Sequence, residues 1–347
     1  MHRRNFLQTV GMTALSVVLS NEILAAARQN KKIKPIEGSW FEFQHHSAVE
    51  GTPWNKTLEQ FTAEQWDAKV KELADAGMRY LALLDVAIYG KTFYPSSLMP
   101  KHQLVCEDPL EVVLSAADKY GIRFFISNGF FGDWTKPVFL MKDPEVRKLR
   151  FKAMNEVAEK YAHHKSFYGW YYPNEIGING HYTDFFIDYV NSSSKEASKL
   201  TPKAKSLIGP YGTRHVKADD EFVRQLEQLD VDFIAYQDEI GVQKTRVEES
   251  AAFYEQLYKL HKKAAKAKLW ADVEVFRFEG KVYNSALLPA PPERVIAQLE
   301  AVSPYVEKIL IYQYGGLINK PGSPVFAGPE ESVKLYNELL KYGYLKN

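Results

Sequence analysis

The chain has 347 residues, of which 46% are hydrophobic and 25% charged, and its formal net charge is +1. This composition allows a large buried core and excludes a disordered chain. The near balance of 44 basic and 43 acidic side chains gives no reason to expect nucleic acid or an anionic membrane surface as the main partner. The single cysteine, Cys106, excludes an internal disulfide.

The N-terminus has the pattern of an export signal. Two arginines at positions 3 and 4 precede an apolar run from about residue 10 to residue 19, and three alanines at 25–27 offer a cleavage site. The apolar run is too short for a stable membrane span. The paired arginines resemble a twin-arginine signal, which exports folded proteins. We therefore expect residues 1–27 to be an export signal, and the mature protein to be periplasmic or otherwise exported, without membrane contact.

Beyond residue 35, two sequence patterns alternate along the chain. Short runs rich in aromatic and β-branched residues are typical of strands, and the longer segments between them have the apolar spacing of helices. The predicted strands are 39–44, 80–86, 123–128, 169–173, 206–210, 233–237, 269–275 and 308–314. The clearest helical segments are 62–78, 108–121, 143–164, 246–267 and 330–343. Thr62 and Asp143 are expected to cap two helices, and Gly77 and Gly121 to end two.

Eight strands alternating with helices predict parallel strands joined by crossover helices. This number of units in about 310 residues fits a single α/β domain with the (β/α)₈ TIM-barrel fold, spanning residues 36–345. No glycine-rich phosphate-binding motif follows the first strand, where Gln44, His45, His46 and Ser47 stand instead. A dinucleotide-binding fold is therefore disfavoured.

Polar residues stand at the end of every predicted strand. Active sites of such barrels lie at the carboxyl ends of the strands, so these residues are expected to converge there. The candidate site residues, in chain order, are His45, Asp85, Asn128, Trp134, Asn174, Glu175, Tyr211, Tyr236, Gln237, Asp238, Glu274 and Tyr312.

Two of these candidates, Glu175 and Glu274, have the placement that glycoside hydrolysis requires. They end the fourth and seventh predicted strands, which lie on roughly opposite sides of an eight-stranded barrel. Hydrolysis of a glycosidic bond uses two carboxyl groups that flank it. With Asn174 directly before Glu175, the arrangement resembles the clan A, or four-seven, retaining glycosidases. That resemblance implies that Glu175 is the acid/base, Glu274 the nucleophile and Asn174 a ligand of a sugar hydroxyl.

A closer resemblance rests on three segments, GWYYPNEI (169–176), YQDEIGV (236–242) and LWADVEVF (269–276). They resemble the signatures of a bacterial family of exported, glycosidase-like barrels whose function is largely unassigned. The resemblance covers about residues 36–345 and implies a barrel and a carbohydrate-related role. The residues of this chain to which the family's pattern carries over are Glu175, Tyr236, Gln237, Asp238 and Glu274. Glu239 stands where that pattern has a small residue, which adds negative charge and leaves the division of roles open.

The hydrolase interpretation assigns a protonation state to each carboxyl group. Glu175 is expected to be protonated because the bulk of Trp170 and Tyr172 would raise its pKa. Glu274 is expected to be ionised and held by a donor such as Tyr236 or Tyr312. Aromatic side chains can stack on sugar rings, and the candidates are Trp40, Trp134, Tyr211 and Tyr314.

Two other functions fit the same residues. A metal-dependent sugar isomerase or epimerase could gather Glu175, Asp238, Glu274 and His45 around a divalent ion. A non-catalytic carbohydrate-binding barrel could use the acids only to bind hydroxyl groups. The hydrolase interpretation needs a carbohydrate substrate and neither metal nor cofactor.

Overall fold

The computed structural model describes residues 34–346, and eight parallel strands form a closed barrel in this part of the chain. The predicted (β/α)₈ fold is therefore confirmed. The barrel strands are β1 (Ile36–Phe41), β2 (Tyr80–Leu83), β5 (Arg123–Ser127), β6 (Phe167–Tyr172), β7 (Lys205–Ile208), β8 (Phe233–Gln237), β9 (Lys268–Glu274) and β12 (Lys308–Tyr312). The expected export signal lies outside the described residues.

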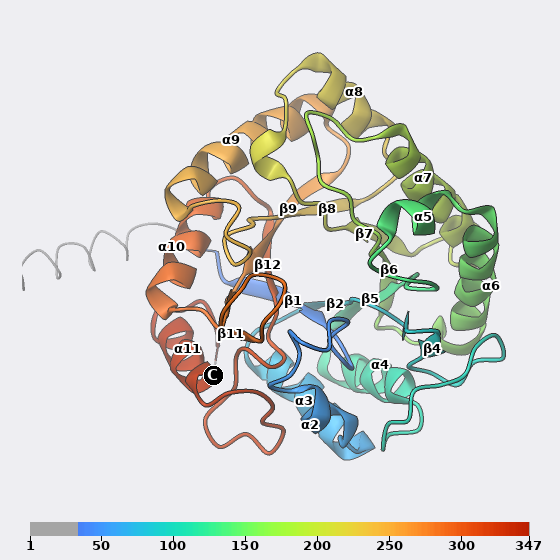
Figure 1. Ribbon diagram of the computed structural model, residues 1–347, viewed down its shortest axis with the longest axis vertical. Helices are drawn as coiled ribbons and strands as arrows, with labels where there is room; N and C mark the ends of the chain where they lie inside the picture. The colour runs from blue at the N-terminus through green and yellow to red at the C-terminus, as the bar shows by residue number, and fades with distance from the viewer. Residues whose placement is uncertain (1–33, 347) are drawn as a thin grey trace, which may run out of the picture. The chain divides into compact units, whose positions relative to one another are not determined.

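The barrel closes between its first and last strands. Strand β1 pairs in parallel with β2 on one side, where Trp40 is opposite Ala82, and with β12 on the other, where Ser39 is opposite Ile311. Around the ring the order follows the chain, so each crossover connects neighbouring strands. Figure 1 shows the strands in the centre and the helices around them, with the blue β1 beside the red-brown β12.

The helices begin and end largely where local sequence signals predict. Their bounds are α2 (Asn55–Glu59), α3 (Ala63–Asp75), α4 (Pro109–Tyr120), α5 (Pro137–Lys142), α6 (Pro144–Tyr161), α7 (Asp184–Leu200), α8 (Asp220–Gln228), α9 (Val247–Ala264), α10 (Pro292–Val302) and α11 (Glu331–Lys341). Thr62 forms a capping box with Gln65 before α3, and Asp143 accepts two backbone N–H bonds before α6. Gly121 has a left-handed conformation (φ 73°) at the end of α4, which glycine adopts without strain.

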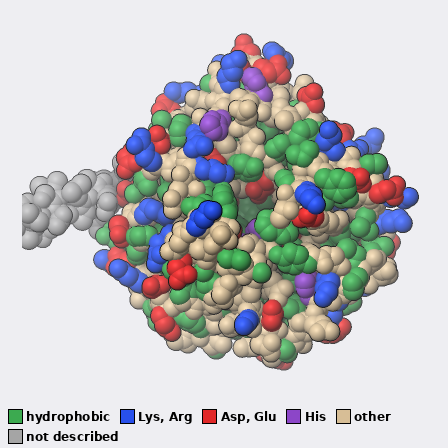
Figure 2. Space-filling model, in the orientation of Figure 1, with side chains coloured by type: hydrophobic (Ala, Val, Ile, Leu, Met, Phe, Trp, Pro, Cys, Tyr) green, Lys and Arg blue, Asp and Glu red, His purple; other side chains and the backbone are tan. Residues whose placement is uncertain are grey.

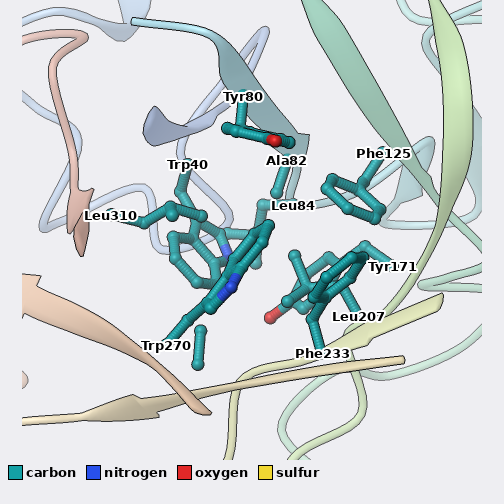
Figure 3. Close-up of a cluster of buried hydrophobic side chains, with 11 residues drawn as sticks. Trp40, Tyr80, Ala82, Leu84, Phe125, Tyr171, Leu207, Phe233, Trp270 and Leu310 are labelled. Atoms are coloured by element: carbon teal, nitrogen blue, oxygen red, sulfur yellow. The ribbon is translucent and has the colours of Figure 1, made fainter. Parts of the chain in front are cut away.

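The barrel interior is filled by apolar and aromatic side chains to which every barrel strand contributes. Trp270 of β9 stacks on Phe233 of β8 with ring centroids 4.3 Å apart, and Tyr80 of β2 meets Trp270 edge-on at 5.1 Å. Figure 3 shows these rings turned toward one another inside the barrel, with Trp40, Phe125 and Tyr171. The interior is thus a packed core, so a ligand-binding site can form only beyond it, at the carboxyl ends of the strands.

Two short antiparallel hairpins extend the loops that follow the barrel strands. They are β3 (Ala87–Ile88) with β4 (Lys91–Thr92), after β2, and β10 (Phe276–Phe278) with β11 (Leu287–Pro289), after β9. A 3₁₀ turn, η1 (Thr213–His215), follows β7. Within residues 34–346, no helix has both the length and the apolar character needed to span a bilayer.

Candidate active site

A cavity of about 420 Å³ lies above the packed core, at the carboxyl ends of the strands. Seven of the predicted site residues line it, namely His45, Trp134, Glu175, Tyr211, Gln237, Glu274 and Tyr312. The hollow in the centre of Figure 2 has acidic atoms within it. The volume is in the range of pockets that bind small molecules.

Glu175 follows β6 and reaches the cavity half-buried. Its two carboxylate oxygens accept hydrogen bonds from the hydroxyl of Tyr171 at 3.0 Å and from Nε2 of Gln237 at 2.7 Å. Burial raises the pKa of Glu175 to about 7, while these two hydrogen bonds oppose the rise. A carboxyl group with this pKa can both donate and accept a proton near neutral pH.

The neighbours of Glu175 differ from those expected from the sequence. Trp170 and Tyr172 point away from the barrel interior, toward the helices, where Trp170 donates to Thr201 and Tyr172 bonds with Ser194. Side chains on a strand alternate between its faces, and Tyr171 is the one that faces inward. The expectation that Trp170 and Tyr172 form the wall beside Glu175 is therefore wrong, although the rise of its pKa agrees with expectation.

Glu274 ends β9 and is almost completely buried, with 3% of its surface exposed. Its Oε2 atom accepts a hydrogen bond from the backbone N–H of Val242 at 2.9 Å. Burial, followed by repulsion from Asp238, raises the pKa of Glu274. The two carboxyl groups therefore resist being ionised together, and Glu274 carries a negative charge most easily when Asp238 holds a proton.

Asp238 and Tyr236 lie behind the cavity wall and do not line it. Asp238 accepts from the backbone N–H of Glu274 at 3.1 Å and from Nε2 of Gln298 at 2.6 Å, so it braces the end of β9. The hydroxyl of Tyr236 bonds with the hydroxyl of Tyr182 and with His261. Direct substrate contacts by these two residues, as the sequence predicts, do not fit this placement, because alternation on β8 turns Gln237 inward and its neighbours outward.

Three more predicted residues are buried away from the cavity lining. Asn128 accepts from the hydroxyl of Tyr189 at 3.2 Å, and the same hydroxyl accepts from the backbone N–H of Asn174 at 3.4 Å. The side-chain oxygen of Asn174 has no hydrogen-bond partner among the described residues. Asp85 is completely buried, and neither of its carboxylate oxygens has a partner there. In this structure none of the three reaches the cavity directly.

Asp272 lines the cavity but was missed from the sequence. It stands two residues before Glu274 on β9 and faces the same way, with 2% of its surface exposed. Its Oδ1 has no hydrogen-bond partner among residues 34–346. Burial and repulsion from Glu274 raise its pKa well above the ordinary value. Strand alternation alone could have identified it, since residues i and i+2 share a face.

His45 follows β1, lines the cavity and contacts the carboxylates of Glu42 and Glu50. Its Nδ1 lies 3.1 Å from Glu42 and 3.2 Å from the hydroxyl of Tyr312, and its Nε2 lies 3.2 Å from Glu50. Burial opposes a charge on the imidazole, but the two carboxylates outweigh it and raise the pKa of His45 to about 9. His46 lines the cavity beside it, edge-on to the ring of Trp134 with centroids 4.5 Å apart.

Aromatic side chains and one lysine line the mouth of the cavity. Nζ of Lys244 lies 4.7 Å from the ring centroid of Tyr211 and 5.5 Å from that of Tyr283. Trp40 lines the floor, whereas Tyr314 is fully buried and does not line the cavity. Of the four expected stacking residues, Trp40, Trp134 and Tyr211 are therefore in place to meet a ligand.

Glu239 holds the loop after β7. Its Oε2 accepts from the backbone N–H groups of Gly212 at 2.8 Å and Thr213 at 3.1 Å. The backbone of Glu239 itself has φ 55°, an uncommon conformation for this residue type. The extra acid therefore has a structural task, and it also adds negative charge to the cavity that it lines.

Within residues 34–346, the side chains that are close enough to share a metal ion are not those expected from the sequence. The set of Glu175, Asp238, Glu274 and His45 does not form a group of ligand atoms close enough to share an ion. Two other groups do, with ligand atoms within 4.8 Å of one another: Glu42 with His45 and His46, and Glu111 with His163 and His164. The isomerase hypothesis thus lacks the ligand set that it assumed.

Comparison with known protein families gives one match. A family model described as Domain of unknown function (DUF4434) matches residues 36–325. None of the curated proteins compared with the sequence matches it.

Solved structures share the barrel at low sequence identity. A protein named as a candidate alpha-L-fucosidase from Bacteroides thetaiotaomicron VPI-5482 is 18% identical, with a TM-score of 0.71 over 91% of this chain and 95% of that one. An endo-1,4-beta-mannanase from Rhizomucor miehei is 10% identical, with a TM-score of 0.55 over 90% of this chain and 96% of that one. A beta-galactosidase from Marinomonas ef1 is also 10% identical, with a TM-score of 0.56 over 88% of this chain and 59% of that one. At these identities the likeness shows the fold.

Proposed function

Because the chain belongs to the DUF4434 family, whose description names no activity, its function has to be argued from the site, and we propose that it is a retaining glycoside hydrolase. One observation carries the proposal: carboxyl groups from the fourth and seventh barrel strands, Glu175 and Glu274, line one cavity together with aromatic side chains. Solved structures with the same fold include proteins named for the cleavage of glycosides, which supports a carbohydrate substrate.

The proposed reaction has two steps. In the first, the carboxylate of Glu274 attacks the anomeric carbon, the bond to the leaving oxygen breaks, and Glu175 gives that oxygen its proton. In the second, Glu175 takes a proton from water, whose oxygen attacks the anomeric carbon and releases Glu274. Glu175 changes from acid to base between the steps, and a pKa of about 7 suits both roles.

The surrounding residues are arranged to support these roles. Gln237 and Tyr171 donate to Glu175, which orients its carboxyl group, and the backbone N–H of Val242 donates to the carboxylate of Glu274. Asp272 offers an unpartnered oxygen at the base of the cavity, where a hydroxyl group of a sugar can donate to it. Trp40, Trp134 and Tyr211 offer apolar ring surface to the C–H faces of a sugar.

The test is hydrolysis of a panel of aryl glycosides and oligosaccharides by the purified protein and its Glu175→Gln and Glu274→Gln variants. We expect turnover by the wild type and a loss of at least about 10³-fold in both variants for an unactivated substrate, because each removes one of the two essential carboxyl groups. Glu248→Gln, which alters an exposed residue in the first turn of α9, is the control and should hydrolyse like the wild type.

Two further measurements separate the roles. A dinitrophenyl leaving group needs no proton, so Glu175→Ala should form the glycosyl-enzyme nearly normally on that substrate, whereas Glu274→Ala should not. NMR of the first product should show the anomeric configuration of the substrate. Sugar binding without turnover of any substrate would overturn hydrolysis and leave a binding protein. An inverted product would overturn the nucleophilic role of Glu274.

We also propose that the protein is exported to the periplasm by a twin-arginine signal at residues 1–27. The paired arginines at 3 and 4 support this proposal. Replacement of both by lysine should keep the protein in the cytoplasmic fraction of the cell. Unchanged export of that variant would exclude the twin-arginine route.

A further inference from the structure

A second group of polar side chains adjoins the cavity at the end of β1. One ligand-type atom from each of Glu42, His45 and His46 lies within 4.8 Å of the other two. Glu42 and His45 are buried, and the half-buried His46 lines the cavity beside His45. Two imidazoles and one carboxylate are a ligand set that binds first-row divalent metal ions and leaves coordination positions open.

The hydrogen bonds around these side chains resemble the outer shell of a metal site. Nδ1 of His45 and Oε2 of Glu42 are 3.1 Å apart, a separation that suits two ligands each about 2 Å from one ion. Nε2 of the same ring lies 3.2 Å from Glu50, and a metal-bound histidine commonly donates its other N–H to a carboxylate. The other oxygen of Glu42 accepts from Trp54 at 3.1 Å and from Gln313 at 2.5 Å, which holds the carboxylate in place.

Two polar groups beside Glu42 and His45 lack partners among the described residues. Asp85 is completely buried with both carboxylate oxygens unpartnered, and the charges that act on it are those of Glu42 and His45. Nδ1 of His46 is also buried without a partner. A buried polar group without a hydrogen bond is costly, and a bound cation would offset that cost.

We propose that Glu42, His45 and His46 bind one divalent first-row transition-metal ion, with Asp85 beside it. Ca²⁺ and Mg²⁺ prefer oxygen ligands, so the two imidazoles favour an ion such as Zn²⁺. Because His45 and His46 line the cavity, the open coordination positions face a bound sugar and can take a pair of its hydroxyl groups. This goes beyond the proposed hydrolysis: the ion holds the substrate, while Glu175 and Glu274 act on the glycosidic bond.

The test is calorimetric titration of the chelator-treated, full-length protein with Zn²⁺ in the absence of any substrate, with excess Mg²⁺ present. We expect one tightly bound Zn²⁺ per chain. His46→Gln removes a ligand and should weaken binding by at least about 100-fold, and Glu50→Gln, which removes the partner of His45, by about 10- to 100-fold. Both positions are only half-buried, and thermal melts of the metal-free variants will verify that they fold.

The matched control is His163→Gln, which alters the other metal-capable group, formed by Glu111 of α4 with His163 and His164 in the turn after α6. Among the described residues, that group has no buried side-chain atom without a hydrogen-bond partner, whereas at the proposed site Nδ1 of His46 and both carboxylate oxygens of Asp85 lack one. The control should bind Zn²⁺ like the wild type. The proposal is overturned if the wild type binds no Zn²⁺, if His46→Gln and Glu50→Gln bind it unchanged, or if only His163→Gln loses it. Because no substrate is used, failure here is distinct from failure of the proposed hydrolysis.

Discussion

Repulsion between two buried carboxyl groups controls how the proposed nucleophile can ionise. The pKa of Glu274 is raised first by burial and then by Asp238, which lies behind it and accepts the hydrogen bond of its backbone N–H. A nucleophile must be ionised, so activity should fall as the pH drops through the raised pKa of Glu274. The acidic limb of the pH profile therefore reports on this pair of residues.

Replacing Asp238 by Asn should move that limb. Asp238→Asn removes the like charge, so the pKa of Glu274 falls and the acidic limb of kcat/KM shifts to lower pH. The amide oxygen can still accept from the N–H of Glu274, whereas Gln298, which accepts from Arg294 and donates to the carbonyl of Glu274, loses its second acceptor. The measurement is the pH dependence of kcat/KM on a hydrolysed aryl glycoside. Asp184→Asn, an exposed change on α7, is the control. An acidic limb that stays in place or moves upward would contradict this explanation.

Whether a predicted residue lines the cavity depends on the direction in which its side chain points. Three of the predicted residues, Glu175, Gln237 and Glu274, line the cavity, and alternation from Glu274 would have added Asp272. Asn174 could not be placed in this way, because the chain leaves the regular strand at Tyr172 and alternation no longer applies beyond it.

At the scale of elements, local chemistry predicted the helix starts well. Asp143 lies before α6, and its Oδ1 accepts from the backbone N–H groups of Glu145 and Val146, each at 3.0 Å. These are two of the donors that a helix leaves unsatisfied at its N-terminus. The cap was predictable because all of its partners lie within three residues.

Removing that cap should destabilise the protein measurably. Asp143→Ala removes the oxygen that accepts both hydrogen bonds, and we expect the free energy of unfolding to fall by about 1 kcal/mol. Asp143→Asn keeps an acceptor oxygen and should cost much less. Urea denaturation followed by circular dichroism measures both variants. Equal losses in the two would show that charge at the helix terminus, rather than the hydrogen bonds, carries the effect.

Strand ends were predicted less precisely than strand positions. All eight barrel strands overlap the predicted ranges, but the first was expected over 39–44 and is Ile36–Phe41, and the second was expected over 80–86 and ends at Leu83. Beyond it the chain stays apolar and buried while leaving the ladder, since the backbone N–H of Val86 donates to Gly129 in a loop. Hydrophobicity continues past the end of the strand, so composition alone cannot mark it.

At the scale of the whole molecule, the packed interior supports the cavity above it. Trp270 is fully buried at its centre and contacts Phe233 and Tyr80, which come from strands on different sides of the barrel. Asp272 and Glu274 follow on the same face of β9, so the position of this ring determines how the acids are presented.

Truncating this ring should destabilise the barrel. Trp270→Ala leaves a large cavity, and we expect a loss of about 3–5 kcal/mol in the free energy of unfolding. Tyr258→Ala, at a ring on α9 that is 43% exposed, should cost far less. Thermal and urea denaturation of both variants provide the test. Similar losses at the two positions would contradict a central role for the interior cluster.

The sequence by itself determined the order of strands and helices, the barrel class and the gathering of polar residues at strand ends. Those features follow from periodicity and from caps, which depend on residues near one another in the chain. Only the tertiary structure decided which polar residues open into the cavity, how far burial shifts their pKa values, and that Glu42 meets His45 and His46. These properties depend on contacts between residues that are far apart in the chain and on how deeply each side chain is buried. A local sequence pattern contains neither kind of information.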